Sequence, residues 1–233
     1  MIDWHSHILP AMDDGSRSVA ESISMINMQV SQGVSTVIAT PHFYANDGTV
    51  DSFLDRRKKA LELLEAELPD GPPRILLGAE VKYYQGISRL EELKALRIEN
   101  TKLLLLEMPV SRWTESMIRE LIELSGKSGI RIILAHMERY FKFQDQSVWE
   151  RIFESGILSQ ANSSFFTSLA TKRKALALLR DGRIQFIGSD CHNLTSRPPQ
   201  IGKAFDIIKK KLGNDYISQM SEYGYSLLAI NNN

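Results

Sequence analysis

The stretch VSTVIA at residues 34–39 is a short apolar run rich in β-branched residues, and Thr40-Pro41-His42 follows it directly. A run of this length between a glycine and a proline is typical of a buried strand. The segment before it opens with the capping box Ser18-Val19-Ala20-Glu21, has apolar residues at helical spacing and closes at Gly33. Residues 18–39 therefore predict a helix followed by a strand.

Similar apolar runs recur along the chain, and each is followed by a longer segment with helical spacing. The seven runs span residues 1–4, 34–39, 74–79, 102–106, 130–135, 157–161 and 184–188. Alternation of strands and helices is typical of βα units around a parallel sheet. We therefore predict an α/β fold.

The 233 residues fit one compact domain, and no Pro/Gly/Ser-rich linker or internal repeat divides them. We expect a single domain over residues 1–233. Residues 81–101 are the least regular and predict an insertion near the mouth of the site, and the asparagines at 231–233 predict an untethered tail. The 28 basic and 28 acidic residues balance, so no nucleic-acid or membrane partner is expected from bulk charge.

The N-terminal residues lack the basic start and long apolar core of a secretory signal, and no apolar run approaches the ~20 residues of a membrane span. The single cysteine, Cys191, cannot form an internal disulfide. Both observations favour a cytoplasmic location.

Polar residues of the metal-binding types stand directly after the apolar runs. They are His5, His7, His42, Glu80, Glu107, His136, Asp190 and His192, and they include all five histidines of the chain. In a parallel α/β barrel the C-terminal ends of the strands form one rim, where active sites are built. We therefore expect these side chains to converge on one cavity.

The residue types point to a metal centre. His5 and His7 are two residues apart, so in an extended backbone both rings lie on the same side and can hold one ion. Asp190 and His192 repeat this spacing with a carboxylate. The mixture of imidazole and carboxylate ligands suits Mn, Fe or Zn rather than calcium, and the several carboxylates favour more than one ion.

Several motifs together resemble a known superfamily. They are HSH (5–7), DDG (13–15), TPH (40–42), GAE (78–80), AHMERY (135–140) and SDCHN (189–193). In this order they resemble the polymerase and histidinol phosphatase superfamily. The N-terminal MIDWHSHILP, AHMERY and the HNLTSRPP at 192–199 are similar to the bacterial manganese-dependent tyrosine-protein phosphatases of capsule and exopolysaccharide operons.

The resemblance implies a distorted seven-stranded (β/α)7 TIM-like barrel with three divalent metal ions at its C-terminal rim, Mn being favoured. It implies one ion held by His5, His7, Glu80 and Asp190, a second by Glu80, Glu107 and His136, and a third by Asp14, His42 and His192. Without it, Asp13-Asp14-Gly15 reads equally well as a turn. It also implies that Arg139 and Arg197 contact the substrate phosphate.

The implied reaction is hydrolysis of phosphotyrosine on a protein, by attack of a metal-activated hydroxide. The implied partner is a bacterial tyrosine kinase with a tyrosine-rich tail that controls polysaccharide synthesis. Membrane association is expected to be peripheral and only through that partner.

Three other functions use the same residues. A histidinol-phosphate or other small-molecule phosphatase would differ in its loops rather than its ligands, and a non-catalytic regulator would bind metal without turnover. Aromatic residues near strand ends could contact the ring of a phosphotyrosine, which would favour that substrate, although ordinary packing explains each of them as well. They are Phe43, Tyr44, Tyr83, Tyr84 and Trp113. Exonuclease activity fits worst, because a basic stripe for a nucleic-acid backbone is missing.

Cys191 and Arg197 also satisfy the C-x5-R pattern of cysteine-based tyrosine phosphatases. That chemistry needs a thiolate surrounded by backbone amides, and the loop between these two residues contains no glycine and is followed by Pro198-Pro199. We therefore predict that Cys191 takes no part in the reaction.

Overall fold

The structure is a computed structural model in which residues 1–69 and 71–228 are described, so the predicted tail at 231–233 lies outside the described residues. Its strands are β1 (Ile2–Ser6), β2 (Thr36–Ala39), β3 (His42–Phe43), β4 (Arg74–Leu77), β5 (Glu80–Lys82), β6 (Leu103–Glu107), β7 (Arg131–Leu134), β8 (Leu158–Asn162) and β9 (Phe186–Gly188). Its α-helices are α1 (Val19–Ser31), α2 (Val50–Glu65), α3 (Glu115–Ser125), α4 (Gln146–Glu154), α5 (Ser163–Thr167), α6 (Lys172–Arg180), α7 (Gly202–Leu212) and α8 (Asn214–Leu227). Three 3-10 helices are η1 (Ile87–Arg89), η2 (Glu91–Leu96) and η3 (Met137–Tyr140).

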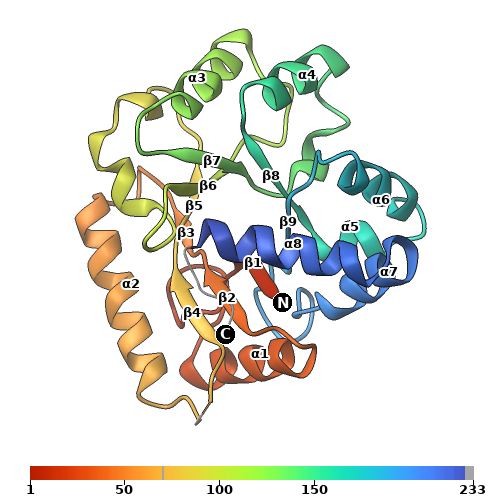
Figure 1. Cartoon of the computed structure of the whole chain (residues 1–233). Coiled ribbons are helices and arrows are strands. Elements are labelled where there is room, and N and C mark those ends of the chain that lie inside the picture. The colour runs from red at the N-terminus through yellow and green to blue at the C-terminus, as the bar shows by residue number, and fades with distance from the viewer. Residues whose placement is uncertain (70, 229–233) are drawn as a thin grey trace.

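The strands pair in parallel and curl around a common centre, with helices on the outside (Figure 1). They form one sheet of order β1-β2-β4 and one of order β3-β5-β6-β7-β8-β9. A parallel bridge from Ser6 to Cys191 links β1 to the residues after β9. The predicted α/β fold is confirmed in the form of a curled parallel sheet.

Each of the seven predicted runs overlaps a strand, but the described residues form nine strands. The two additional strands, β3 and β5, follow β2 and β4 after breaks of two residues. Pro41 lies in the first break and has no amide to donate to a neighbouring strand, although its carbonyl still accepts from the Glu80 amide at 3.0 Å. Regular pairing is therefore interrupted just before His42 and Glu80.

The helix α1 begins where the capping box predicts. Ser18 is its N-cap and accepts a hydrogen bond from the Glu21 amide, while Gly33 follows its end with φ of 87°. A residue with a Cβ is disfavoured in this left-handed conformation, which explains why glycine ends the helix here.

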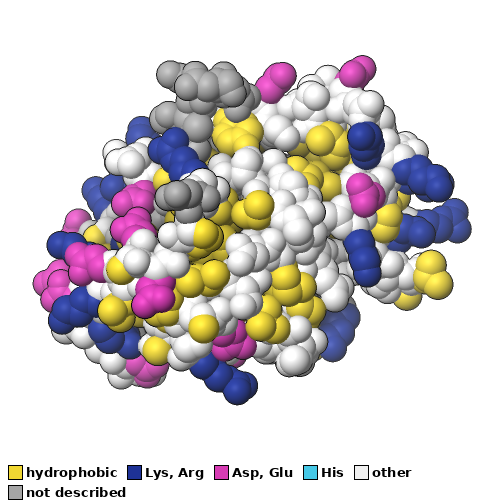
Figure 2. Space-filling model, turned by 90° about the horizontal axis from the view of Figure 1, so that it is seen from below, with side chains coloured by type: hydrophobic (Ala, Val, Ile, Leu, Met, Phe, Trp, Pro, Cys, Tyr) yellow, Lys and Arg dark blue, Asp and Glu magenta, His cyan; other side chains and the backbone are white. Residues whose placement is uncertain are grey.

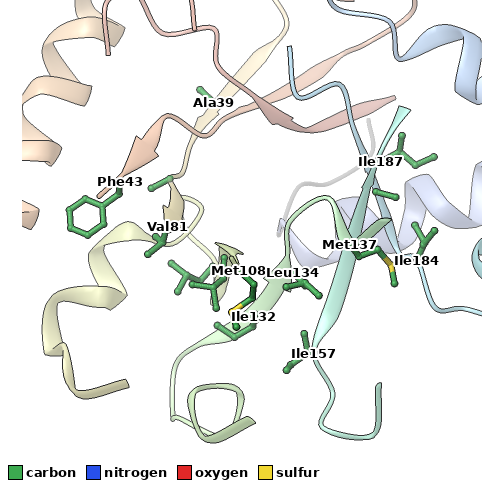
Figure 3. Close-up of a cluster of buried hydrophobic side chains, with 14 of the residues drawn as sticks. Ala39, Phe43, Val81, Met108, Ile132, Leu134, Met137, Ile157, Ile184 and Ile187 are labelled. Atoms are coloured by element: carbon green, nitrogen blue, oxygen red, sulfur yellow. The ribbon is translucent and has the colours of Figure 1, made fainter. Parts of the chain in front are cut away.

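Apolar side chains fill both faces of the curled sheet. On the outer face they pack against the helices, as Figure 3 shows for Ala39, Phe43, Ile132 and Ile157. On the inner face a second cluster includes Trp4, Ile38, Leu105, Ile133 and Phe186. Burial of these two apolar surfaces is the main force that holds the sheet curled.

The helix α8 crosses one end of the curled sheet (Figure 1). Gly224 lies against Ile2 and Trp4, and the Tyr225 hydroxyl is 2.9 Å from Ser35 Oγ. The Tyr223 ring stacks on Phe186 with centroids 6.1 Å apart. Ile2, Ser35 and Phe186 stand at or just before the starts of strands, so α8 covers the apolar interior near the end opposite to the strand C-termini.

Residues 83–101 form the connection between β5 and β6 rather than an α-helical crossover. Their 3-10 helices pack on the outside of the sheet, η1 against α3 and η2 against α2. The first residues of the predicted insertion reach the site, because Lys82 Nζ donates to Glu107 Oε2 at 2.8 Å.

The surface matches the balanced composition. On the face shown in Figure 2, hydrophobic side chains are scattered and both acidic and basic side chains are present. None of the helices in the described part of the chain is long and apolar enough to cross a membrane.

Candidate metal centre

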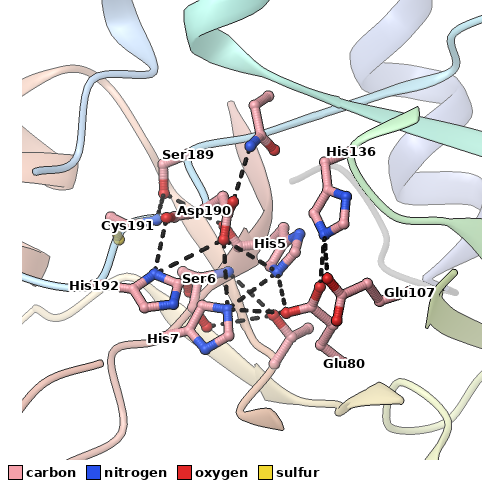
Figure 4. Close-up of polar contacts among 12 residues, drawn as sticks. His5, Ser6, His7, Glu80, Glu107, His136, Ser189, Asp190, Cys191 and His192 are labelled. Carbon is pink, nitrogen blue, oxygen red and sulfur yellow. Dashed lines mark hydrogen bonds and ion pairs between the residues drawn. The ribbon is translucent and has the colours of Figure 1, made fainter. Parts of the chain in front are cut away.

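The first two histidines are brought together by β1. Its pairing with β2 shifts between Asp3 and Ser6, where β1 has one residue more than its partner. Such a bulge bends a strand and re-aims its side chains. The Nε2 atoms of His5 and His7 lie 3.1 Å apart (Figure 4), which agrees with the orientation predicted from their spacing.

Two carboxylates complete this group. Glu80 Oε2 is 3.0 Å from His5 Nε2 and 3.2 Å from His7 Nε2. Asp190 Oδ1 is 3.5 Å from both nitrogens. One ligand atom from each of the four side chains lies within 4.8 Å of every other, and all four residues are buried. These are the four residues expected to hold one ion.

The second carboxylate oxygen of Glu80 faces another group. Glu80 Oε1 is 2.8 Å from His136 Nε2, and Glu107 Oε1 is 3.6 Å from the same nitrogen. Glu107 Oε2 accepts a hydrogen bond from Lys82 Nζ at 2.8 Å. Glu80 therefore stands between two groups of ligand atoms, as a bridging carboxylate does.

A third group lies at the outer edge of the site. Asp14 Oδ1 is 3.5 Å from His42 Nε2 and 3.4 Å from His192 Nε2. His7 also belongs to this group by distance. Asp14 is 67% exposed, whereas the other predicted ligands have little or no exposure, so this group is open to solvent.

The histidines and carboxylates of the first group shift one another's pKa. Burial lowers the pKa of His5 and His7, but the Glu80 and Asp190 carboxylates, with Asp13 for His7, outweigh burial and raise both values. Burial likewise raises the pKa of Glu80 and Asp190, but these histidines hold both well below their usual range. Buried anionic oxygens and imidazole nitrogens thus face one point, where a cation is favoured.

Two buried ring nitrogens show that these residues fit a metal. Among the described residues, His42 Nδ1 and His192 Nε2 are buried and make no hydrogen bond, although carboxylate oxygens of Glu80 and Asp14 lie 3.2 and 3.4 Å from them. The other ring nitrogen of His192 is 3.0 Å from the Asp190 carbonyl, and burial lowers the pKa of His192 to about 4. The ring is then neutral, and its unpartnered nitrogen offers a lone pair to an ion.

Three further residues orient the ligands, and sequence reasoning missed them. Asp13 Oδ2 is 2.7 Å from His7 Nδ1 and accepts from the His42 amide at 2.8 Å. Gln160 Oε1 is 3.1 Å from His5 Nδ1, and the Tyr140 hydroxyl is 3.2 Å from His136 Nδ1. Each leaves the Nε2 atom of its histidine facing the centre. Gln160 lies inside a strand and has no motif, so no signal in the sequence identifies it.

We expect Asp13→Asn to weaken metal binding about 10- to 100-fold, because the neutral amide supports His7 less well than a carboxylate does. The measurement is a titration of the metal-stripped protein with Mn²⁺. Asp55→Asn, at an exposed position of α2, is the matched control and should bind as the wild type does. Equal affinity of the Asp13 and control variants would contradict the orienting role.

The backbone around the ligands is constrained. His136 and Asp190 have positive φ values of 31° and 51°, a conformation that costs free energy in a residue with a side chain. At Gly188 an added Cβ would lie 2.5 Å from His5 Cβ, so a larger residue cannot occupy this position without moving the ligand.

The two predicted phosphate-binding arginines meet at Asp190. Nη2 of Arg139 and Nη2 of Arg197 lie 2.5 and 2.8 Å from Asp190 Oδ2, which also accepts from Asn162 at 2.8 Å. Their side chains are 35% and 38% exposed. Both guanidinium groups therefore lie beside the first ligand group with part of their surface toward solvent.

The predicted exclusion of Cys191 agrees with its surroundings. The thiol is completely buried, and burial raises its pKa well above the usual range. The amides of Thr195, Ser196 and Arg197 donate to Asn193 Oδ1 at 2.8 to 3.1 Å. The amides that would have to surround a phosphate therefore bind a side chain instead.

Proteins of known function resemble this chain over nearly its whole length. A tyrosine-protein phosphatase of Bacillus subtilis, YwqE, is 32% identical over 238 residues, which cover 98% of this chain and 91% of the relative. The tyrosine-protein phosphatase CpsB of Streptococcus agalactiae serotype III is also 32% identical, with 94% of each chain covered.

Solved structures show the same relationship. One belongs to the crystal structures of YwqE from Bacillus subtilis and CpsB from Streptococcus pneumoniae, which are described as unique metal-dependent tyrosine phosphatases. It superposes with a TM-score of 0.81 at 29% identity, covering 100% of this chain and 96% of the other. An organophosphorus hydrolase variant from Deinococcus radiodurans has a TM-score of 0.53 at 13% identity, covering 93% of this chain and 88% of the other. The second match concerns the fold alone.

Residues 1–224 match the family described as capsular polysaccharide synthesis, CpsB/CapC. The match covers most of the chain and includes every residue of the candidate metal centre. The chain therefore belongs to the CpsB/CapC family.

Proposed function

We propose that this chain is a metal-dependent phosphatase that hydrolyses phosphotyrosine on proteins. The observation that supports this most is the overlap of the ligand groups: Glu80 belongs to the first and the second, and His7 to the first and the third. His42 of the third group also lies within reach of Glu80 and Glu107. A shared carboxylate is typical of sites that bind several ions close together. The similarity to YwqE and CpsB supports the choice of phosphotyrosine.

In this proposal three divalent ions bind at the rim. His5, His7, Glu80 and Asp190 hold the first, Glu80, Glu107 and His136 the second, and Asp14, His42 and His192 the third. Mn is the ion we favour, and Fe or Zn also suits a mixture of imidazole and carboxylate ligands.

When bound, such ions lower the pKa of water to give a nucleophile at neutral pH and neutralise the charge of the phosphoryl group. The chain itself orients the substrate. Arg139 and Arg197 bind the remaining phosphoryl oxygens, for which a planar guanidinium has matching geometry. Tyrosine has a phenol pKa near ~10 and leaves more readily than an alkyl alcohol, so this site needs no strong general acid among its side chains.

The partner protein and the location that we propose are inferred from the same family. The partner we propose is a bacterial tyrosine kinase of capsule or exopolysaccharide synthesis, met in the cytoplasm, with membrane association only through that partner. We also propose that the curled sheet is a distorted seven-stranded barrel in which β2 with β3 and β4 with β5 each count as one interrupted strand, within a single domain over residues 1–233.

Hydrolysis of a phosphotyrosine peptide and of histidinol phosphate, by protein stripped of metal and then restored, tests the proposal. Chelation and His136→Ala should abolish peptide hydrolysis, because both remove ligand–metal contacts, while Cys191→Ser should retain most of it. Loss of activity in Cys191→Ser at unchanged metal content would favour cysteine chemistry. Faster turnover of histidinol phosphate would overturn the substrate, and bound metal without turnover would indicate a regulator.

A further inference from the structure

A cavity of about 170 Å³ lies beside the third ligand group, between the loop after β1 and the start of α2. Asp14 and His42 line it on one side, and Phe43, Tyr44, Phe53 and Arg56 are among the residues that complete it. An apolar cavity of about 150 Å³ can hold a benzene ring. The lining of this cavity is partly polar, since it also includes Asp13 and Asp47, but its volume is sufficient for one aromatic ring at a place that adjoins candidate metal ligands.

Tyr44 is placed to contact such a ring. Its own ring stacks on His42 with centroids 5.1 Å apart and an interplanar angle of 28°, and it is 37% exposed. Phe43 is buried and packs edge-on against Phe53 with centroids 5.3 Å apart. These two rings form the apolar side of the cavity. Tyr44 thus has a free aromatic surface next to a ligand.

The other aromatic residues near strand ends are already engaged. Trp113 is 4% exposed, and its Nε1 donates to the Pro109 carbonyl at 2.9 Å. The Tyr83 hydroxyl donates to Glu120 at 2.7 Å, and Tyr84 is packed against the outer core. Of the five aromatic residues considered from the sequence, Tyr44 alone combines exposure with a place in this cavity.

We propose that this cavity, with Tyr44 as its specificity-determining residue, binds the phenyl ring of phosphotyrosine. The inference rests on the proposed function, because it requires the phosphate to bind at the metal centre. In an aryl phosphate a single oxygen joins the ring to phosphorus, so the ring must lie directly beside the ions. A ring in this cavity meets that requirement, whereas a methyl ester or methylphosphonate has no ring to fill it, and in histidinol phosphate a carbon chain separates the ring from phosphorus.

Binding of two non-hydrolysable ligands by the metal-loaded protein tests this inference. Phenylphosphonate and methylphosphonate carry the same anionic group with and without the ring, and calorimetry gives both Kd values. Tyr44→Leu should weaken phenylphosphonate binding about three- to tenfold, the usual range for a lost aromatic pair, and leave methylphosphonate binding unchanged. Tyr44→Phe should bind both ligands as the wild type does, because it keeps the ring.

Tyr223→Leu is the matched control, since Tyr223 is also 37% exposed but lies on α8 at the other end of the sheet. Equal weakening of both ligands in Tyr44→Leu would mean that Tyr44 only supports His42, and this result overturns the inference. So does a wild type that binds phenylphosphonate no better than methylphosphonate. A protein that prefers phenylphosphonate but does not hydrolyse the phosphotyrosine peptide would refute the proposed function and leave the ring site standing.

Discussion

Glu80→Gln should lower hydrolysis of a phosphotyrosine peptide on the order of 10³-fold. The two oxygens of Glu80 face different groups, with Oε2 3.0 Å from His5 Nε2 and Oε1 2.8 Å from His136 Nε2. Glutamine has nearly the same shape but replaces one oxygen by an NH2 group, which donates hydrogen bonds and cannot ligate a cation. Two ions would then lose a shared ligand and its negative charge. Steady-state kinetics and the metal content of the purified variant measure the effect.

Glu120→Gln provides the matched control for this change. Glu120 is a partly buried glutamate that accepts hydrogen bonds from the Tyr83 hydroxyl and from Ser88, and it lies outside the three ligand groups. It should retain the metal content and most of the activity of the wild type. A Glu80→Gln protein with full metal content and near-normal turnover would show that Glu80 does not bridge.

Arg139→Ala should lower kcat/KM for the phosphotyrosine peptide about 10²- to 10³-fold. The Arg139 guanidinium already binds Asp190 and keeps about a third of its side-chain surface exposed, so its remaining N–H groups can bind phosphoryl oxygens. Arg139→Lys should recover only part of the loss, because an ammonium group cannot donate two parallel hydrogen bonds.

A purely structural role of Arg139 can be separated from phosphate binding. If Arg139 only holds Asp190 in place, the variant should lose metal, whereas loss of phosphate binding should leave the metal content unchanged and raise the Ki of inorganic phosphate. Arg151→Ala removes an arginine whose two nitrogens bind Glu115 at 2.7 and 2.9 Å on the surface. This control should change neither quantity.

Much of the local structure could be predicted because it depends on neighbouring residues. The helix α1 begins at the Ser18 capping box and is followed by Gly33, as predicted, since capping and glycine conformation act within one turn. The short strands β3 and β5 could not be predicted. Their bounds depend on pairing with each other, as His42 pairs with Glu80 and Phe43 with Val81, and these partners lie far apart in the chain.

The packing of helix α8 could not be predicted from the sequence either. The sequence of α8 contains no motif, yet the helix covers the apolar interior by packing Gly224 on Ile2 and Trp4. The connection at residues 83–101 also differs from the predicted insertion at the site mouth, because η1 and η2 pack on the outer helices α3 and α2. Both outcomes depend on surfaces formed by residues far away in the chain.

The sequence by itself determined the α/β alternation and the position of every candidate ligand except Asp14 after an apolar run, because strand length, capping and H-x-H spacing are local properties. Only the tertiary structure decided which ligand atoms face one another, that Asp13, Gln160 and Tyr140 orient the histidines, and that Arg139 and Arg197 both meet Asp190. In the folded chain Tyr44 is exposed beside His42, whereas Cys191 is buried. These contacts join residues from opposite ends of the chain, such as His5 with Asp190 and Asp14 with His192, and only the packing of the whole sheet brings such residues together.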